Sequence, residues 1–152
     1  MKSYFTMTQT IGRPIAEVFE TVIRIDNFPT WSPRNPSARK LSDGPIGDGT
    51  RFELGIKAFG KVTMELREFV LNGEVMITPV SRMFEGGHRW RFSDDGTGGT
   101  SIDHELEMRV KGLFKPMAPM MRANGRKNLL DTTAALKRHL EAMTTAASSD
   151  RA

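Results

Sequence analysis

The sequence predicts an α+β protein in which one antiparallel sheet is covered by a long C-terminal helix. Two observations support this prediction. Six stretches between residues 39 and 110 alternate apolar and polar side chains, as strands with one buried face do. From Leu113 to about Met143 the apolar residues instead recur at helical spacing. A single sheet must bury its apolar face, and this helix is the only predicted element long enough to cover it.

The chain begins with a predicted strand from Ser3 to Ile11, in which alternate side chains share a face. Pro14 suits the first position of a helix, and the apolar residues that follow predict a short helix ending near Asp26. Trp31 lies in a second short helix or turn, which two prolines close. The first strand is therefore followed by two short helical segments.

The segment from Gly44 to Phe52, GPIGDGTRF, is the sharpest connection in the chain. Glycine supplies positive φ and proline fixes φ, so the segment fits neither a helix nor a regular strand. Asn72 and Gly73 predict a two-residue hairpin turn, and residues 93–99 predict a second hairpin loop. The remaining strands are expected at residues 39–42, 51–59, 61–71, 74–80, 83–93 and 100–110.

The predicted C-terminal helix has a broad apolar stripe and an irregular start. Pro116 and Pro119 fall in its first turns, where proline breaks or kinks a helix. Gly125 is a weak point that costs roughly 1 kcal/mol relative to alanine. The stripe consists of Leu113, Met117, Met120, Met121, Leu129, Leu136 and Leu140.

The composition fits one globular domain of 152 residues, with 38% hydrophobic and 26% charged residues. No apolar run approaches the roughly 20 residues that span a bilayer, and the N-terminal residues lack the apolar core of a secretory signal. The absence of cysteine excludes disulfides, thiolate metal sites and a cysteine nucleophile. We expect a single domain over residues 1–143, a frayed tail over 144–152, and a cytoplasmic location.

Motifs from about Tyr4 to Ala142 occur in the order found in one known family. They are Pro14 with Val18 and Phe19, Trp31 with Pro33, Gly44-Pro45, Gly47, Gly49 to Phe52, Pro79 with Arg82, Gly112-Leu113, Ala118 to Met120, Leu136-Lys137 and Leu140-Glu141. This pattern resembles the START-like (SRPBCC) superfamily in its polyketide cyclase/dehydrase branch. The resemblance implies a helix-grip fold, in which a curved seven-stranded antiparallel sheet wraps around the C-terminal helix. It also implies a cavity that binds lipids, sterols, polyketides, hormones or quinones.

The alternation along the strands predicts which side chains face such a cavity. The expected lining residues of the strands are Phe52, Leu54, Ile56, Phe84, His88, Trp90, His104, Leu106 and Met108. Met117, Met120 and Met121 form either an adaptable wall or ordinary core packing. Trp31 is either a lid over the pocket or a plug in the core. Asn124 offers a polar contact inside the cavity or lies exposed on the helix.

Two histidines are the main candidates for chemistry. A hairpin centred on Gly96 places His88 directly opposite His104, about 5 Å apart at Cβ. Because the usual pKa of histidine is about 6.5, the pair can exchange protons with a ligand, or it can bind a ligand, form half of a metal site, or be a polar part of the wall. Arg82 is a third catalytic candidate. No third inward metal ligand is evident, and we expect neither a metal nor a cofactor.

Three functions remain open at this stage. The favoured one is binding of a small apolar or aromatic molecule, such as a lipid, quinone or polyketide-like compound, in the internal cavity. The second is a polyketide cyclase or dehydratase that uses His88, His104 or Arg82. The third is an interaction module that docks through a basic helix face on a ribosome, a membrane or a protein.

The charge distribution bears on the third function. The net charge is +4, with one local cluster of cations and no aromatic residues interleaved with it, so we expect no nucleic-acid binding. This cluster consists of Arg122, Arg126, Lys127, Lys137 and Arg138. We expect a monomer or a homodimer without a transmembrane segment.

Overall fold

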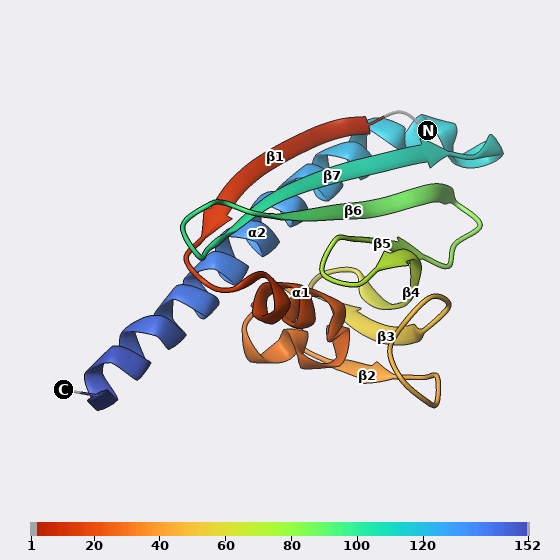
Figure 1. Ribbon diagram of the computed structural model, residues 1–152. Helices are drawn as coiled ribbons and strands as arrows, with labels where there is room; N and C mark the ends of the chain where they lie inside the picture. The colour runs from red at the N-terminus through yellow and green to blue at the C-terminus, as the bar shows by residue number, and fades with distance from the viewer. Residues whose placement is uncertain (1–2, 152) are drawn as a thin grey trace.

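The computed structural model describes the backbone of residues 3–151 and the side chains of residues 5–143. Its elements follow the predicted order, with a strand, two short helices, six strands and a long helix (Figure 1). They are β1 (Ser3–Ile11), α1 (Ile15–Ile23), η1 (Ile25–Thr30), β2 (Ala38–Lys40), β3 (Arg51–Ile56), β4 (Gly60–Val70), β5 (Glu74–Pro79), β6 (Phe84–Asp94), β7 (Thr100–Val110), η2 (Gly112–Met117) and α2 (Ala118–Arg151). The α+β class is confirmed.

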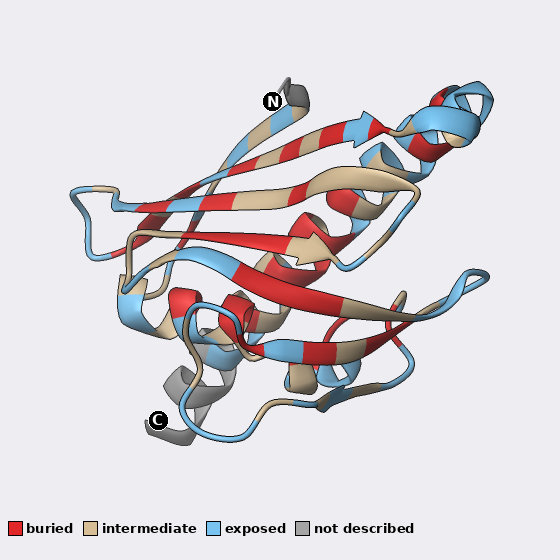
Figure 2. Cartoon of the chain, turned by 90° about the vertical axis from the view of Figure 1, so that its right-hand side faces the viewer, coloured by how far each residue is buried: buried red, intermediate tan, exposed pale blue. Residues whose placement is uncertain are grey.

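The seven strands form one antiparallel sheet with the order β1-β7-β6-β5-β4-β3-β2. The sheet curves around α2, which packs mainly on β7 and β1, while α1 packs on β6 and η1 on β2 and β3 (Figure 1). Figure 2 shows buried residues on the strands and along the side of α2 that faces them. This arrangement is the helix-grip fold that the sequence predicts.

The core consists of two apolar clusters. The main cluster joins α1, η1 and the later turns of α2 to the sheet, and Phe19 lies at its centre with its ring edge-on to Phe92 at 5.1 Å. The second cluster joins the end of β7 to η2 and the first turns of α2, through Leu106, Met108 and Met121. The strands β6 and β7 therefore run from one cluster to the other.

The start of the C-terminal helix differs from the predicted stripe. Leu113 is 96% exposed, and Met117 and Met120 are 38% and 54% exposed, so these three residues do not belong to the buried face. For Leu113 and Met117 the cause is η2, a 3₁₀ turn around Pro116 that precedes the α-helix and has a different periodicity. Met120 lies in α2, next to the buried Met121, and one residue along a helix turns the side chain by about 100° away from the buried face. From Met121 onward the stripe is buried as predicted. The helix bounds extend to Arg151, past the predicted domain end, and the fraying of 144–152 stays a prediction.

Gly125 is a contact position as well as a weak point. A Cβ atom placed there would lie 2.6 Å from Leu106 Cδ2, so glycine allows α2 to approach β7 closely.

The main difference between the predicted and the observed sheet is the register of the last hairpin, between β6 and β7. Trp90, not His88, lies directly opposite His104, because Asp95 holds the N–H groups of Thr97 and Gly99 and moves the centre of the loop. A shift of two residues keeps every side chain on its predicted face.

Gly87 allows a close approach between β6 and β5, and this contact generates a prediction. A Cβ atom at residue 87 would meet the carbonyl oxygen of Ile77 and lie 2.8 Å from Thr78 Cα. Backbone atoms cannot rotate away, so Gly87→Ala should lower the free energy of unfolding by about 2–3 kcal/mol. Urea denaturation measures the change. Gly47→Ala is the control, since no atom lies within 4 Å of its added Cβ; equal stability of the two variants would contradict this packing.

Candidate functional site

His88 on β6 and His104 on β7 form a hydrogen-bonded pair on the inner face of the sheet. His88 Nδ1 lies 3.0 Å from His104 Nε2, although the two residues are diagonal neighbours rather than directly opposite. His104 is 1% exposed, and its ring stacks on Trp90 with 3.6 Å between centroids. Trp90 Nε1 has no hydrogen-bond acceptor among the described residues. The predicted contact between two inward histidines is therefore present, with a corrected register.

A chain of hydrogen bonds assigns the proton of each ring. Thr133 Oγ1 donates to the carbonyl oxygen of Leu129 at 2.6 Å, because a carbonyl can only accept. The same hydroxyl accepts a bond of 2.9 Å from His104 Nδ1, which must carry the proton. His104 Nε2 is then an acceptor and His88 Nδ1 is its donor. His88 Nε2 is left with a lone pair, and no described residue bonds to it.

Both imidazoles are neutral at pH 7, as this hydrogen-bond chain requires. Burial lowers the pKa of His88 to about 4. Burial also lowers the pKa of His104 well below its usual value, and repulsion from a charged His88 adds to the effect. Protonation of His104 would break its bond with His88, because His104 Nδ1 already donates and its Nε2 must accept. A proton on His88 would go to its free Nε2, and burial opposes the resulting charge.

His88 lies at the end of an apolar strip that α2 leaves partly uncovered. Five inward-facing side chains of β3 to β6 form this inner strip and are half-buried, whereas the inward-facing side chains of the same strands nearer α1 are buried. The pairings of β3 to β7 place them side by side on the inner face, at the end of the sheet away from α1. The inner strip consists of Ile56, Val62, Pro79, Phe84 and His88.

The other predicted site residues fall into two groups. One group belongs to the packed core and is less than 10% exposed: Trp31, Phe52, Leu54, Trp90, His104, Leu106, Met108 and Met121. The second lies on the surface: Arg82, Met117, Met120 and Asn124 are exposed. Trp31 is thus a core plug. No contact among the described residues joins Arg82 to the histidines, and its catalytic role stays a prediction.

Thr133, Val62 and Pro79 were not predicted as site residues. Thr133 is fully buried, one turn after Leu129 and one turn before the buried Leu136. A threonine inside an apolar helical stripe needs a partner, and that requirement is the signal that points to His104. Val62 and Pro79 carry no comparable signal, because apolar strand residues are common on any buried face.

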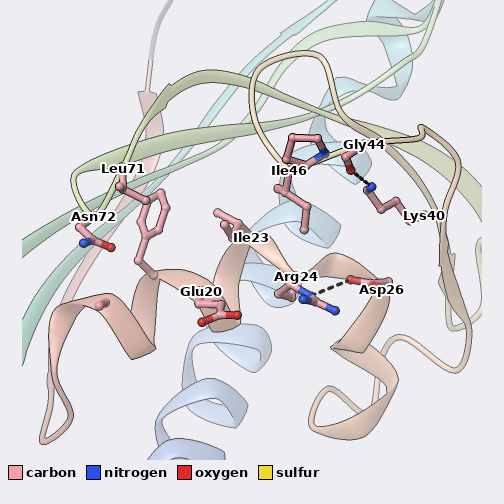
Figure 3. A pocket seen from close by; sticks show the side chains of 12 residues that line it. Glu20, Ile23, Arg24, Asp26, Lys40, Gly44, Ile46, Leu71 and Asn72 are labelled. Atoms are coloured by element: carbon pink, nitrogen blue, oxygen red, sulfur yellow. Dashed lines mark hydrogen bonds and ion pairs between the residues drawn. The ribbon is translucent and has the colours of Figure 1, made fainter.

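The structure also shows two surface hollows away from the inner strip. The first, of about 510 Å³, lies between α1, the β2–β3 connection and the β4–β5 turn, with Ile23, Ile46 and Leu71 around it (Figure 3). The second, of about 420 Å³, lies between β1 and α2 and includes Met7 and Lys137. Neither contains a residue of the predicted lining. The enclosed cavity that the sequence predicts is not one of these hollows.

Two further findings concern metal binding and membrane crossing in the described part of the chain. It contains no group of three or more His, Cys, Asp or Glu side chains placed to hold a metal ion. None of its helices combines the length and hydrophobicity needed to cross a bilayer.

A curved antiparallel sheet gripping a long C-terminal helix is the architecture of START-like helix-grip proteins. Residues 4–141 match the family described as polyketide cyclase / dehydrase and lipid transport, so the chain belongs to this family. No curated protein matches the sequence.

Solved structures of the same fold have low sequence identity to the chain. A START superfamily protein from Mycobacterium smegmatis is 15% identical, with a TM-score of 0.71 over 93% of this chain and 99% of that one. The Zhui aromatase/cyclase from Streptomyces sp. R1128 is 15% identical, with a TM-score of 0.68 over 90% and 92%. The di-domain aromatase/cyclase StfQ of the steffimycin biosynthetic pathway is 15% identical, with a TM-score of 0.65 over 93% and 46%. These likenesses support the fold.

The lowered pKa values of the two histidines predict acid sensitivity. The unfolded chain takes up protons near the usual histidine pKa of about 6.5, whereas folded His88 takes one up only near pH 4. The unfolded state binds more protons in between, so stability should fall as the pH falls, by about 2 kcal/mol between pH 7 and pH 5 for His88 alone. Urea denaturation across this pH range measures the slope.

Two variants show whether this slope belongs to the pair. His88→Gln should reduce it, and His139→Gln, which changes the third histidine of the chain, should leave it as in the wild type. A flat profile for the wild type, or a slope that disappears only in His139→Gln, would be inconsistent with a neutral buried pair.

Proposed function

We propose that the protein binds a small apolar or aromatic molecule that carries a hydroxyl group, on the inner strip between the sheet and α2. The observation that supports it most is the lone pair of His88 Nε2 at the end of an apolar surface. Every other nitrogen of the pair is engaged. An acceptor of this kind orients a ligand whose remaining surface is apolar, which is the usual composition of small-molecule sites.

The family supports the chemical class of the ligand. The family description includes lipid transport and polyketide cyclases, whose compounds combine apolar bodies with hydroxyl and carbonyl groups. We therefore favour a polyketide-like, quinol-like or lipid molecule. A cytoplasmic location and a monomeric or homodimeric state stay predictions.

The pKa of His88 favours binding over proton transfer. A general base works best when its pKa lies near the working pH. With a pKa of about 4, His88 is a weak base at pH 7, although it remains a good hydrogen-bond acceptor. The exposed Arg82 does not compensate for this low basicity. The cyclase or dehydratase alternative is accordingly less well supported than binding.

A pair of matched probes tests the proposal. We expect 1-naphthol to bind more tightly than 1-methoxynaphthalene by about 5-fold, because only the naphthol can donate a hydrogen bond, and one such bond contributes about 1 kcal/mol. His88→Phe should remove this preference and leave the affinity for 1-methoxynaphthalene close to that of the wild type. Isothermal titration calorimetry measures both affinities.

The control variant lies at the first surface hollow. Leu71→Asp places a charge at its 73% exposed rim and should change neither affinity. Loss of binding in Leu71→Asp would assign the ligand to that hollow instead. A wild type that binds neither probe, or a His88→Phe variant that keeps the preference for naphthol, would refute the proposed site.

A further inference from the structure

The positive charge of the protein is concentrated in one short segment. From Lys111 to Leu130 the chain has five lysine or arginine residues and no aspartate or glutamate. The whole chain has a net charge of +4, so the rest of the chain, without these five cations, has a net charge of −1. Lys111 directly precedes η2, Lys115 lies in η2, and the other three cations lie in the first turns of α2. We refer to residues 111–127 as the basic tip.

The basic tip also presents apolar side chains to solvent. Leu113 is 96% exposed, and Met120 and Met117 are 54% and 38% exposed. Single exposed apolar residues are common, but three of them within eight positions, on a segment with two exposed prolines, form a patch. Phe114 is half-buried against the second cluster and anchors the segment, which holds Leu113 outward.

A neighbouring connection extends the same surface. Lys111 N–H donates a hydrogen bond of 2.9 Å to Met83 O, which joins η2 to the connection between β5 and β6. That connection carries the exposed Val80 and Arg82. The acidic side chain against this surface is Glu85, which pairs with Lys111 at 3.2 Å and with Arg109. Figure 2 shows the exposed turn of η2 at the upper right, projecting beyond the end of the sheet.

We propose that the basic tip docks on an anionic lipid bilayer. Leu113, Met117 and Met120 enter the interface, where apolar side chains gain more than in water. Lys115, Lys127 and the arginines of the tip lie at the level of the anionic headgroups, which attract clustered cations. Arg126 already lies over the Phe5 ring, 4.8 Å from its centroid, so its charge is held at the surface.

The charge and the apolar side chains together favour a bilayer over a nucleic acid or an acidic protein. Single-stranded nucleic acids are bound by aromatic platforms interleaved with cations, and the only aromatic residue of the tip is the half-buried Phe114. An acidic protein surface would account for the cations but not for a leucine and two methionines extended toward solvent. This proposal stands on the tip alone and does not require a ligand on the inner strip.

Vesicle sedimentation tests the docking. We expect the wild type to bind vesicles with 30% phosphatidylglycerol at 50 mM NaCl, to bind at least 5-fold more weakly at 500 mM NaCl, and not to bind pure phosphatidylcholine. Leu113→Asp and Lys115→Glu should each weaken binding by at least 10-fold. Neither side chain is buried, so both variants should melt like the wild type. Leu71→Asp, in the turn at the opposite end of β5, is the matched control and should bind as the wild type does.

A second measurement separates insertion from simple charge attraction. The fluorescence of Leu113→Trp should shift to shorter wavelength on phosphatidylglycerol vesicles, because the indole moves into an apolar environment. Binding that depends on salt but not on Leu113→Asp, without that shift, would refute insertion and indicate an acidic macromolecule as the partner. Absence of vesicle binding at 50 mM NaCl would overturn the proposal, whatever the naphthol experiment shows.

Discussion

The buried hydrogen-bond chain from α2 to the sheet is the constraint on which the rest of this structure depends. An imidazole with 1% exposure, stacked on an indole, is costly unless both nitrogens are bonded. Thr133 and His88 meet that requirement for His104, and Thr133 in turn bonds to the backbone of its own helix. This hydroxyl group therefore helps to set the rotation and height of α2 on the sheet, together with the bonds from Gln9 to Thr133 O and from Lys137 to Thr10 O. Gly125, two turns earlier, lets the same helix approach Leu106.

The position of α2 explains why the inner face is unevenly covered. Because Thr133 must face β7, the helix lies over β7 and β1, and α1 and η1 cover the opposite end of the sheet. The part of β3 to β6 that neither group covers is the inner strip. The sequence predicts an enclosed cavity with many lining residues. The structure instead packs most of them into the core and leaves an apolar strip ending in His88.

Most of the fold could be predicted from alternation and turn residues, because both are local. The inward face of β6 and β7 follows from strand parity, and it survives the error in register because the shift is an even number of residues. The register itself depends on how Asp95 bonds to the loop, which composition alone does not reveal. The exposure of Leu113 and Met117 has a similar origin. Helical periodicity predicts an α-helix through this segment, which instead forms a 3₁₀ turn.

The two proposed surfaces meet at one end of the sheet, although each was inferred from separate observations. Val110, the last residue of β7, pairs with Phe84 of the inner strip, and the basic tip begins directly after it. Along β6, His88 follows Phe84 by four residues, which is about 13 Å of extended chain. Gly86 lies between them without a side chain to obstruct the path. A molecule leaving a bilayer at Leu113 would thus meet apolar side chains until it reached the imidazole acceptor. Under the two proposals together, the histidine pair and the exposed leucine would serve one purpose, the transfer of an apolar molecule between a membrane and the protein interior.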